Sequence, residues 1–174
     1  MPAVPVPAPE GPSLMTTYAG VQRAEAFAVA HGFELPILMA PMAGACPPAL
    51  AAAVARAGGL GGCGALLMQP DAIRAWAAAV RAETNGAFQM NLWIPDPTPH
   101  RDAANETALR AFLETWGPPV PAEAAEAAPP DFKGQCQAML DAGPAIISSI
   151  MGIYPPDFIS EMKFRGVKWF ANIT

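Results

Sequence analysis

Residues 35–64 constrain the fold more than any other part of the chain, because two short apolar runs there flank a run of helix-forming residues. Residues 35–39 form an apolar run of the kind found in a strand that is buried on both faces. Leu60 begins a second, very short strand that ends at Gly64. A strand, a helix and a strand within about 30 residues make a βαβ unit, which implies a parallel sheet.

The helix between these two strands is predicted over residues 49–57, most of which are strong helix formers. Pro47 and Pro48 precede it, and proline suits the first helical turn because its missing N–H would be unpaired there anyway. Gly58 and Gly59 then end the helix. The unit is therefore complete within a short stretch of sequence.

Helices and strands continue to alternate through the rest of the chain. A helix over residues 18–30, which Thr16 or Thr17 can cap, precedes the first strand. Residues 117–130 form a longer irregular insertion than a barrel loop normally needs. After the first βαβ unit we expect helices over residues 69–83, 101–116, 132–142 and 155–165, and strands over residues 87–93, 145–150 and 167–173.

Strict alternation of this kind indicates either a doubly wound open sheet or a (β/α)8 barrel. The phosphate-binding pattern GxGxxG of a dinucleotide site is absent after the first strand. The nearest candidate begins at Gly59, at the second strand, and lacks the spacing. The predicted fold is therefore an α/β TIM barrel, truncated here after about the fifth strand.

Three segments follow from this interpretation. Residues 1–14 are a proline-rich leader that we expect to be disordered, because proline suits neither a helix interior nor a central strand. Residues 15–34 carry the helix that precedes the barrel. Residues 35–174 form the partial barrel domain.

The composition excludes several classes of protein. Of the 174 residues, 52% are hydrophobic and 14% are charged, which indicates a globular chain with a core. The formal net charge is −5 and no Lys/Arg-rich run occurs, so we expect neither a nucleic acid nor an anionic membrane surface as a partner. No apolar stretch approaches the roughly 18–20 residues of a membrane span, and the N-terminus lacks the pattern of a signal peptide.

The three cysteines indicate a reducing compartment. Cys46, Cys63 and Cys136 are odd in number, far apart and without CxxC spacing. We therefore expect free thiols in the cytoplasm, with no disulfide framework and no metal site.

Five segments of the sequence resemble the nitronate monooxygenase family, also called 2-nitropropane dioxygenases. The similarity is carried by residues 35–44, 57–61 and 91–93, and continues more weakly through residues 148–152 and 167–171. The resemblance covers nearly everything from Leu35 to Thr174. It implies an FMN-containing (β/α)8 barrel that oxidises alkyl nitronates with O2.

The first candidate cofactor contacts are Ala40, Pro41 and Met42. Barrel enzymes place their chemistry at the carboxyl ends of the strands, where these residues follow the first apolar run. Small residues let a flat ring approach the backbone, and a thioether offers a polarizable surface to an aromatic ring. The resemblance assigns Ala40 and Met42 to flavin contacts. The alternative is a proline-broken strand end with a core methionine.

Polar residues in two later strands complete the candidate site. Asn91 is an amide in an otherwise apolar run, so a buried position requires a hydrogen-bond partner. The family uses this asparagine to bind the flavin, and the alternative is a satisfied structural amide. One of Ser148 and Ser149 must face the barrel, either lining the substrate position or filling the interior.

The chain also departs from the family pattern. The resemblance implies that the catalytic histidine lies beyond Thr174, and barrels usually bind the flavin phosphate after strands seven and eight. We therefore expect the chain alone to be inactive, without the charged anchor that holds FMN. The unpaired edges of the first and fifth strands would invite self-association.

Two alternatives to a nitronate monooxygenase remain open at this stage. One is a flavin-dependent enoyl reductase, which uses a nicotinamide cofactor and the same barrel. The other is a non-catalytic protein, either a truncated frame or a half barrel that pairs with a second chain.

Overall fold

The computed structural model describes residues 19–97, 100–126 and 128–172. The predicted leader at residues 1–14 and the predicted caps Thr16 and Thr17 lie outside these ranges. The elements are α1 (Ala19–Ala30), α2 (Pro48–Arg56), β1 (Gly61–Gly64), α3 (Pro70–Glu83), β2 (Phe88–Trp93), α4 (Ala103–Leu113), the 3-10 helix η1 (Ala122–Glu126), α5 (Phe132–Ala142), β3 (Ile146–Ile150), α6 (Pro156–Phe164) and β4 (Lys168–Ala171).

The four strands form one parallel sheet in the order β1-β2-β3-β4. Each strand thus pairs with the next one along the chain, as in a barrel, whereas a doubly wound sheet reverses its strand order at a switch point. The predicted α/β class with a parallel sheet is confirmed. None of the described helices is long and apolar enough to cross a bilayer.

Alternate residues of the strands face two different cores. On one face Met90, Leu92 and Ile147 pack with side chains from α3, α5 and α6, such as Val80 and Met139. This is the larger core, and it holds the helices against the sheet.

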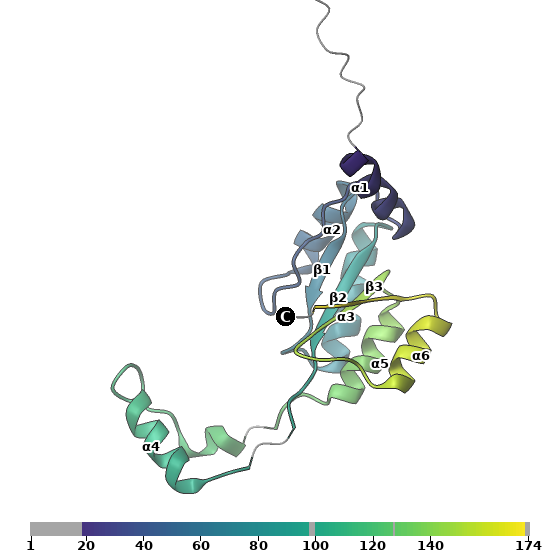
Figure 1. Cartoon of the computed structure of the whole chain (residues 1–174). Coiled ribbons are helices and arrows are strands. Elements are labelled where there is room, and N and C mark those ends of the chain that lie inside the picture. The colour runs from purple at the N-terminus through teal and green to yellow at the C-terminus, as the bar shows by residue number, and fades with distance from the viewer. Residues whose placement is uncertain (1–18, 98–99, 127, 173–174) are drawn as a thin grey trace, which may run out of the picture.

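The opposite face, which corresponds to the barrel interior, carries a smaller core near the amino ends of the strands. Leu60 and Ile146 pack there against Ala28 and Phe33. Ala28 belongs to α1, which lies at the end of the sheet opposite to α4 (Figure 1). The helix before the barrel therefore covers the bottom of this face.

The predicted strand over residues 35–39 is wrong. The segment runs beside β1 through two hydrogen bonds, Leu60 N to Ile37 O at 2.9 Å and Met39 N to Leu60 O at 2.9 Å, and forms only an isolated bridge at Leu38. It is not buried on both faces either, because the Ile37 side chain is 60% exposed. Pro36 lacks an N–H and limits the ladder, and the segment lies at an edge of the described sheet.

Residues 100–126, which we call the α4 arm, leave the sheet after β2 and lie apart from it (Figure 1). The helix is shorter than the predicted range 101–116. The Asp102 carboxylate caps its start by accepting hydrogen bonds from Ala104 N at 2.9 Å and Asn105 N at 3.2 Å. No residue of α4 is buried. Four large apolar side chains lie three or four residues apart within the predicted range 101–116 and form an apolar stripe. All four are exposed: Leu109, Phe112, Leu113 and Trp116.

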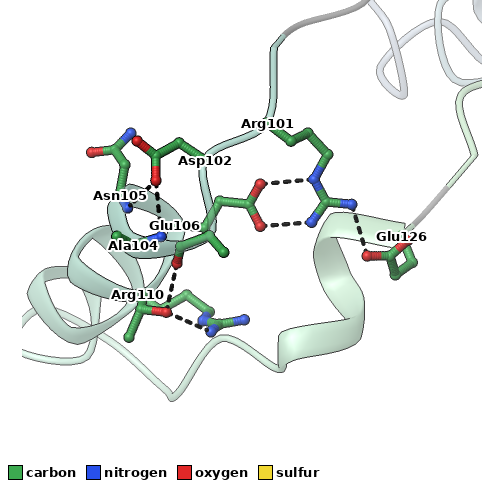
Figure 2. A network of polar contacts seen from close by, with 9 residues as sticks. Arg101, Asp102, Ala104, Asn105, Glu106, Arg110 and Glu126 are labelled. Carbon is green, nitrogen blue, oxygen red and sulfur yellow. Dashed lines mark hydrogen bonds and ion pairs between the residues drawn. The ribbon is translucent and has the colours of Figure 1, made fainter.

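An ion-pair cluster holds the α4 arm together (Figure 2). Arg101 makes two hydrogen bonds to Glu106 at 2.7 and 2.6 Å, and a third to Glu126 at 2.7 Å. Arg101 thereby joins the start of α4 to the end of η1.

Candidate active site

Three of the predicted site residues, Met42, Asn91 and Ser148, belong to neighbouring segments that form a row across the carboxyl end of the sheet. Ala43 forms a bridge with Gly64, Gly64 pairs with Asn91, and Asn91 pairs with Ser148. Neighbouring strands are about 4.8 Å apart, so Ala43 and Asn91 are separated by about 10 Å. The segment of Met42 and the strand of Asn91 therefore meet on the same edge of the sheet, as the flavin interpretation requires.

Gly64 allows this close approach. A Cβ atom at position 64 would lie 2.5 Å from Ala43 N and 2.7 Å from the carbonyl carbon of Met42. Contacts this short exclude any side chain at the position unless the backbone moves. The glycine thus places the Met42 segment directly against β1.

Three hydrogen bonds that involve side chains hold the segment around Met42 in place. Gln89 donates from Nε2 to Met39 O at 2.8 Å, and the Met42 N–H donates to Cys46 Sγ at 3.1 Å. Trp76 donates from Nε1 to Cys46 O at 2.8 Å. Because both ends of the segment are held, Met42 is presented on the surface and is 47% exposed. Among the described residues, Met42 is therefore not part of a core.

Asn91 and Ser148 form the polar centre of the row. Both are buried, and Asn91 Nδ2 donates to Ser148 Oγ at 2.9 Å. They project from the face opposite to Met90 and Ile147, so they point toward the barrel interior. Among the described residues the Asn91 Oδ1 atom accepts no hydrogen bond. Every fully buried side-chain oxygen or nitrogen of these residues has a partner, so Asn91 Oδ1 keeps some access to solvent. That oxygen can therefore accept a hydrogen bond from an N–H group of a ligand.

Ser149 lies on the other face of the sheet. Its Oγ atom accepts a hydrogen bond from Trp169 Nε1 at 3.1 Å, within the core between the sheet and the helices. The structure thus brings Ser148 to Asn91 and separates Ser149 from both. The role of each predicted site residue in binding stays a prediction.

Ionisable groups near the row are held neutral. Burial, and secondly the neighbouring Cys46, raises the pKa of the Cys63 thiol to about 12. Burial also raises the pKa of Tyr154, whose hydroxyl donates to Ser148 O at 3.1 Å. Neither group supplies an anion at neutral pH.

Two glutamines of this region were missed by the sequence interpretation. Gln89 lies two residues before Asn91, so strand alternation could have placed it on the same face. Gln135, in α5, is 3% exposed and donates from Nε2 to Ala65 O, Leu66 O and Met68 O at 3.2, 3.2 and 2.8 Å. No local pattern indicates that Gln135 holds the loop after β1, because the contact joins segments about 70 residues apart.

Comparison with known families gives one consistent result. A protein-family model described as nitronate monooxygenase matches residues 26–174. A nitronate monooxygenase of Paraburkholderia phytofirmans is 36% identical over 149 residues, which are 82% of this chain and 40% of that protein. A nitronate monooxygenase of Pseudomonas aeruginosa is 31% identical over 142 residues, with coverages of 79% and 40%. The chain thus spans about 40% of the length of these curated relatives.

Two solved structures have a similar fold. Nitroalkane oxidase from Streptomyces ansochromogenes superposes with a TM-score of 0.66 and 26% identity, covering 83% of this chain and 42% of that one. FabK from Thermotoga maritima superposes with a TM-score of 0.59 and 25% identity, with coverages of 84% and 36%.

Proposed function

The chain belongs to the nitronate monooxygenase family, and from this premise we propose that it forms the first part of a flavin-dependent oxidoreductase that oxidises alkyl nitronates with O2. The observation that supports this most directly is the row from the Met42 segment through Gly64 to Asn91 and Ser148. A flat ring that lies across this row meets an exposed thioether and an amide at the same time.

We propose FMN as the flavin. Ala40, Pro41 and Met42 would contact the ring along one side, and Asn91 would hydrogen-bond its polar edge through Oδ1. Ser148 orients the Asn91 amide, since the Nδ2–Oγ hydrogen bond fixes which way Oδ1 points. When bound, the flavin supplies the electron-transfer chemistry between the nitronate and O2.

A chimera tests this function. Residues 1–174 would be joined to the part of the Paraburkholderia phytofirmans relative that the chain does not match, and oxygen consumption would be measured with ethyl nitronate. We expect bound flavin and nitronate-dependent oxygen uptake. The enoyl reductase alternative would instead be supported by a flavin-loaded chimera that oxidises NAD(P)H in the absence of O2 and takes up no oxygen with nitronates.

We expect the isolated 174-residue chain to be colourless and inactive with alkyl nitronates, because it spans about 40% of its relatives. Stoichiometric yellow flavin that copurifies with it would contradict this expectation.

We further propose a cytoplasmic location, which the three free thiols support. We also propose self-association through the outer edge of β4, to which no described strand is paired on that side.

A further inference from the structure

The apolar stripe of the α4 arm, which consists of Leu109, Phe112, Leu113 and Trp116, is one continuous surface. The chain keeps turning as a helix past the end of α4, because Trp116 N donates to Leu113 O at 2.9 Å. Spacings of three and four residues therefore put all four side chains on one side of the helix. The ring centroids of Phe112 and Trp116 are 6.2 Å apart, so the two aromatic side chains adjoin.

Most of this surface is in contact with water. Trp116 is 78% exposed and Phe112 is 58% exposed, and both leucines of the stripe are exposed as well. Together the four side chains present about 500 Å² of apolar surface, which equals the largest apolar patch of a typical monomer. A patch of this size marks an interaction surface, whereas single exposed apolar residues do not.

The area and the composition of the stripe fit a second copy of the same chain. Tryptophan and phenylalanine are enriched at the centre of protein interfaces, and no charged residue lies within the stripe. Two stripes packed on each other would remove about 1,000 Å² from water, which is the lower limit for a specific interface. An interface of this size predicts a weak and reversible dimer rather than a permanent one.

Charges beside the stripe favour an antiparallel arrangement of the two helices. Arg110 and Glu114 lie four residues apart, and neither forms an ion pair among the described residues. In an antiparallel pair centred between Phe112 and Leu113, Arg110 of one copy comes near Glu114 of the other. A parallel pair would instead bring like charges together and align the two helix dipoles unfavourably.

We propose that the stripe is a self-docking surface, through which two copies of the chain form a reversible, antiparallel dimer with a Kd on the order of 100 µM. The arm lies apart from the sheet, so a second arm has access to it (Figure 1). This interface is separate from the outer edge of β4 and does not depend on bound flavin. At about 1 µM, the concentration suited to urea denaturation, the chain is then a monomer.

Sedimentation velocity of the 174-residue chain, from about 1 µM to about 300 µM, tests the proposal. We expect the monomer to convert to a dimer over this range. Trp116→Glu and, as a second variant, Phe112→Glu should each weaken association at least tenfold, because the dimer would bury an unpaired carboxylate. Phe164→Glu, which changes an 86% exposed side chain in α6, is the matched control and should leave association unchanged.

A charge exchange tests the arrangement of the helices. Arg110→Glu should weaken the dimer about threefold, the usual effect of one exposed ion pair. Adding Glu114→Arg to this variant should restore the affinity, because the pair is then present with its signs reversed. Failure of the second change to restore the affinity would overturn the antiparallel pairing.

A spin label gives an independent distance. Ala104→Cys places a thiol at the start of α4, and the three native cysteines are buried and therefore protected from the label. Electron-spin resonance should find the two labels of the dimer about 30 Å apart in the antiparallel arrangement. A distance of about 10–15 Å would mean a parallel pair and would overturn the proposal in this form.

Three other outcomes would overturn the proposal as a whole. A dimer that persists unchanged in Trp116→Glu would assign association to the edge of β4. A chain that stays monomeric at about 300 µM would show that the stripe does not bind itself. A chimera that is monomeric where the 174-residue chain dimerises would show that the remainder of the barrel covers the stripe. None of these outcomes bears on the oxidation of nitronates, which the chimera measures independently.

Discussion

The sheet and the α4 arm show two ways in which this chain holds regular structure. In the sheet, strands are covered by apolar side chains, and Met90 and Ile147 are completely buried. In the arm, no residue of α4 is buried, and the segment is held by the exposed ion pairs of Arg101. Burial stabilises far more than exposed ion pairs do. The comparison therefore teaches that secondary structure alone does not reveal which region carries the stability.

Large-to-small substitutions should separate the two regions most strongly. Ile147→Ala should lower the free energy of unfolding by about 3 kcal/mol, because it leaves a cavity between the sheet and the helices. Phe112→Ala, in the exposed stripe of α4, should change it by less than about 0.5 kcal/mol. Urea denaturation followed by circular dichroism measures both values. Equal losses would mean that the α4 arm is packed against something in solution.

Adding a methyl group to a glycine sharpens the same contrast. Gly64→Ala should cost about 1–3 kcal/mol, since the new Cβ would strike the backbone of Ala43. Gly117→Ala, which follows α4 and meets no atom within 4 Å, is the matched control and should be close to neutral. We also expect Gly64→Ala to weaken flavin binding in the chimera. Unchanged stability of Gly64→Ala would show that the Met42 segment can move aside freely.

Loss of the Asn91 amide should affect the cofactor more than the fold. Asn91→Ala should weaken flavin binding by the chimera about tenfold, the equivalent of one hydrogen bond of about 1.4 kcal/mol. Asn105→Ala, in the α4 arm, is the control and should retain full flavin content. Flavin content is read from the absorbance of the purified protein. An unchanged content in Asn91→Ala would reduce that residue to a structural role.

The smallest effect concerns the ion pairs of the α4 arm. The Arg101 guanidinium lowers the pKa of the Glu106 carboxyl from its ordinary value of 4.5. Because the carboxyl has a lower pKa in the folded arm than in the unfolded chain, its ion pair stabilises the folded arm at a pH above the ordinary value. This contribution is lost as the pH falls through the lower pKa of the folded arm. Amide hydrogen exchange in α4 should therefore accelerate in acid or in Arg101→Gln, while exchange in β2 stays slow. Arg110→Gln leaves both ion pairs intact and should leave exchange in α4 nearly unchanged.

The sequence predicts the helices around the sheet well, because residues at the helix ends set where each helix begins and ends. Pro70 begins α3 as expected, and Gly143, with a φ of 58°, ends α5 in the left-handed conformation that favours glycine. The parallel order of the strands then brings Met42 and Asn91 to one edge. These parts follow from residues that lie close together in sequence.

Other features depend on contacts between distant segments, and the sequence does not reveal them. The apolar residues at 35–39 look like a buried strand, but the segment lies at an edge of the described sheet and Ile37 is 60% exposed. The stripe on α4 likewise predicts an amphipathic helix without saying what it packs against. Gln135 is recognised as a support for the loop after β1 only once α5 is placed beneath it.

The chain enters and leaves the α4 arm at one place, since Asp96, before the arm, and Pro129, after it, both line a cavity of about 170 Å³ at the top of the sheet. The arm is therefore a removable module with a single point of attachment. Replacing residues 97–128 by a short glycine-serine linker should leave the remainder folded, and the same junction could accept a foreign domain.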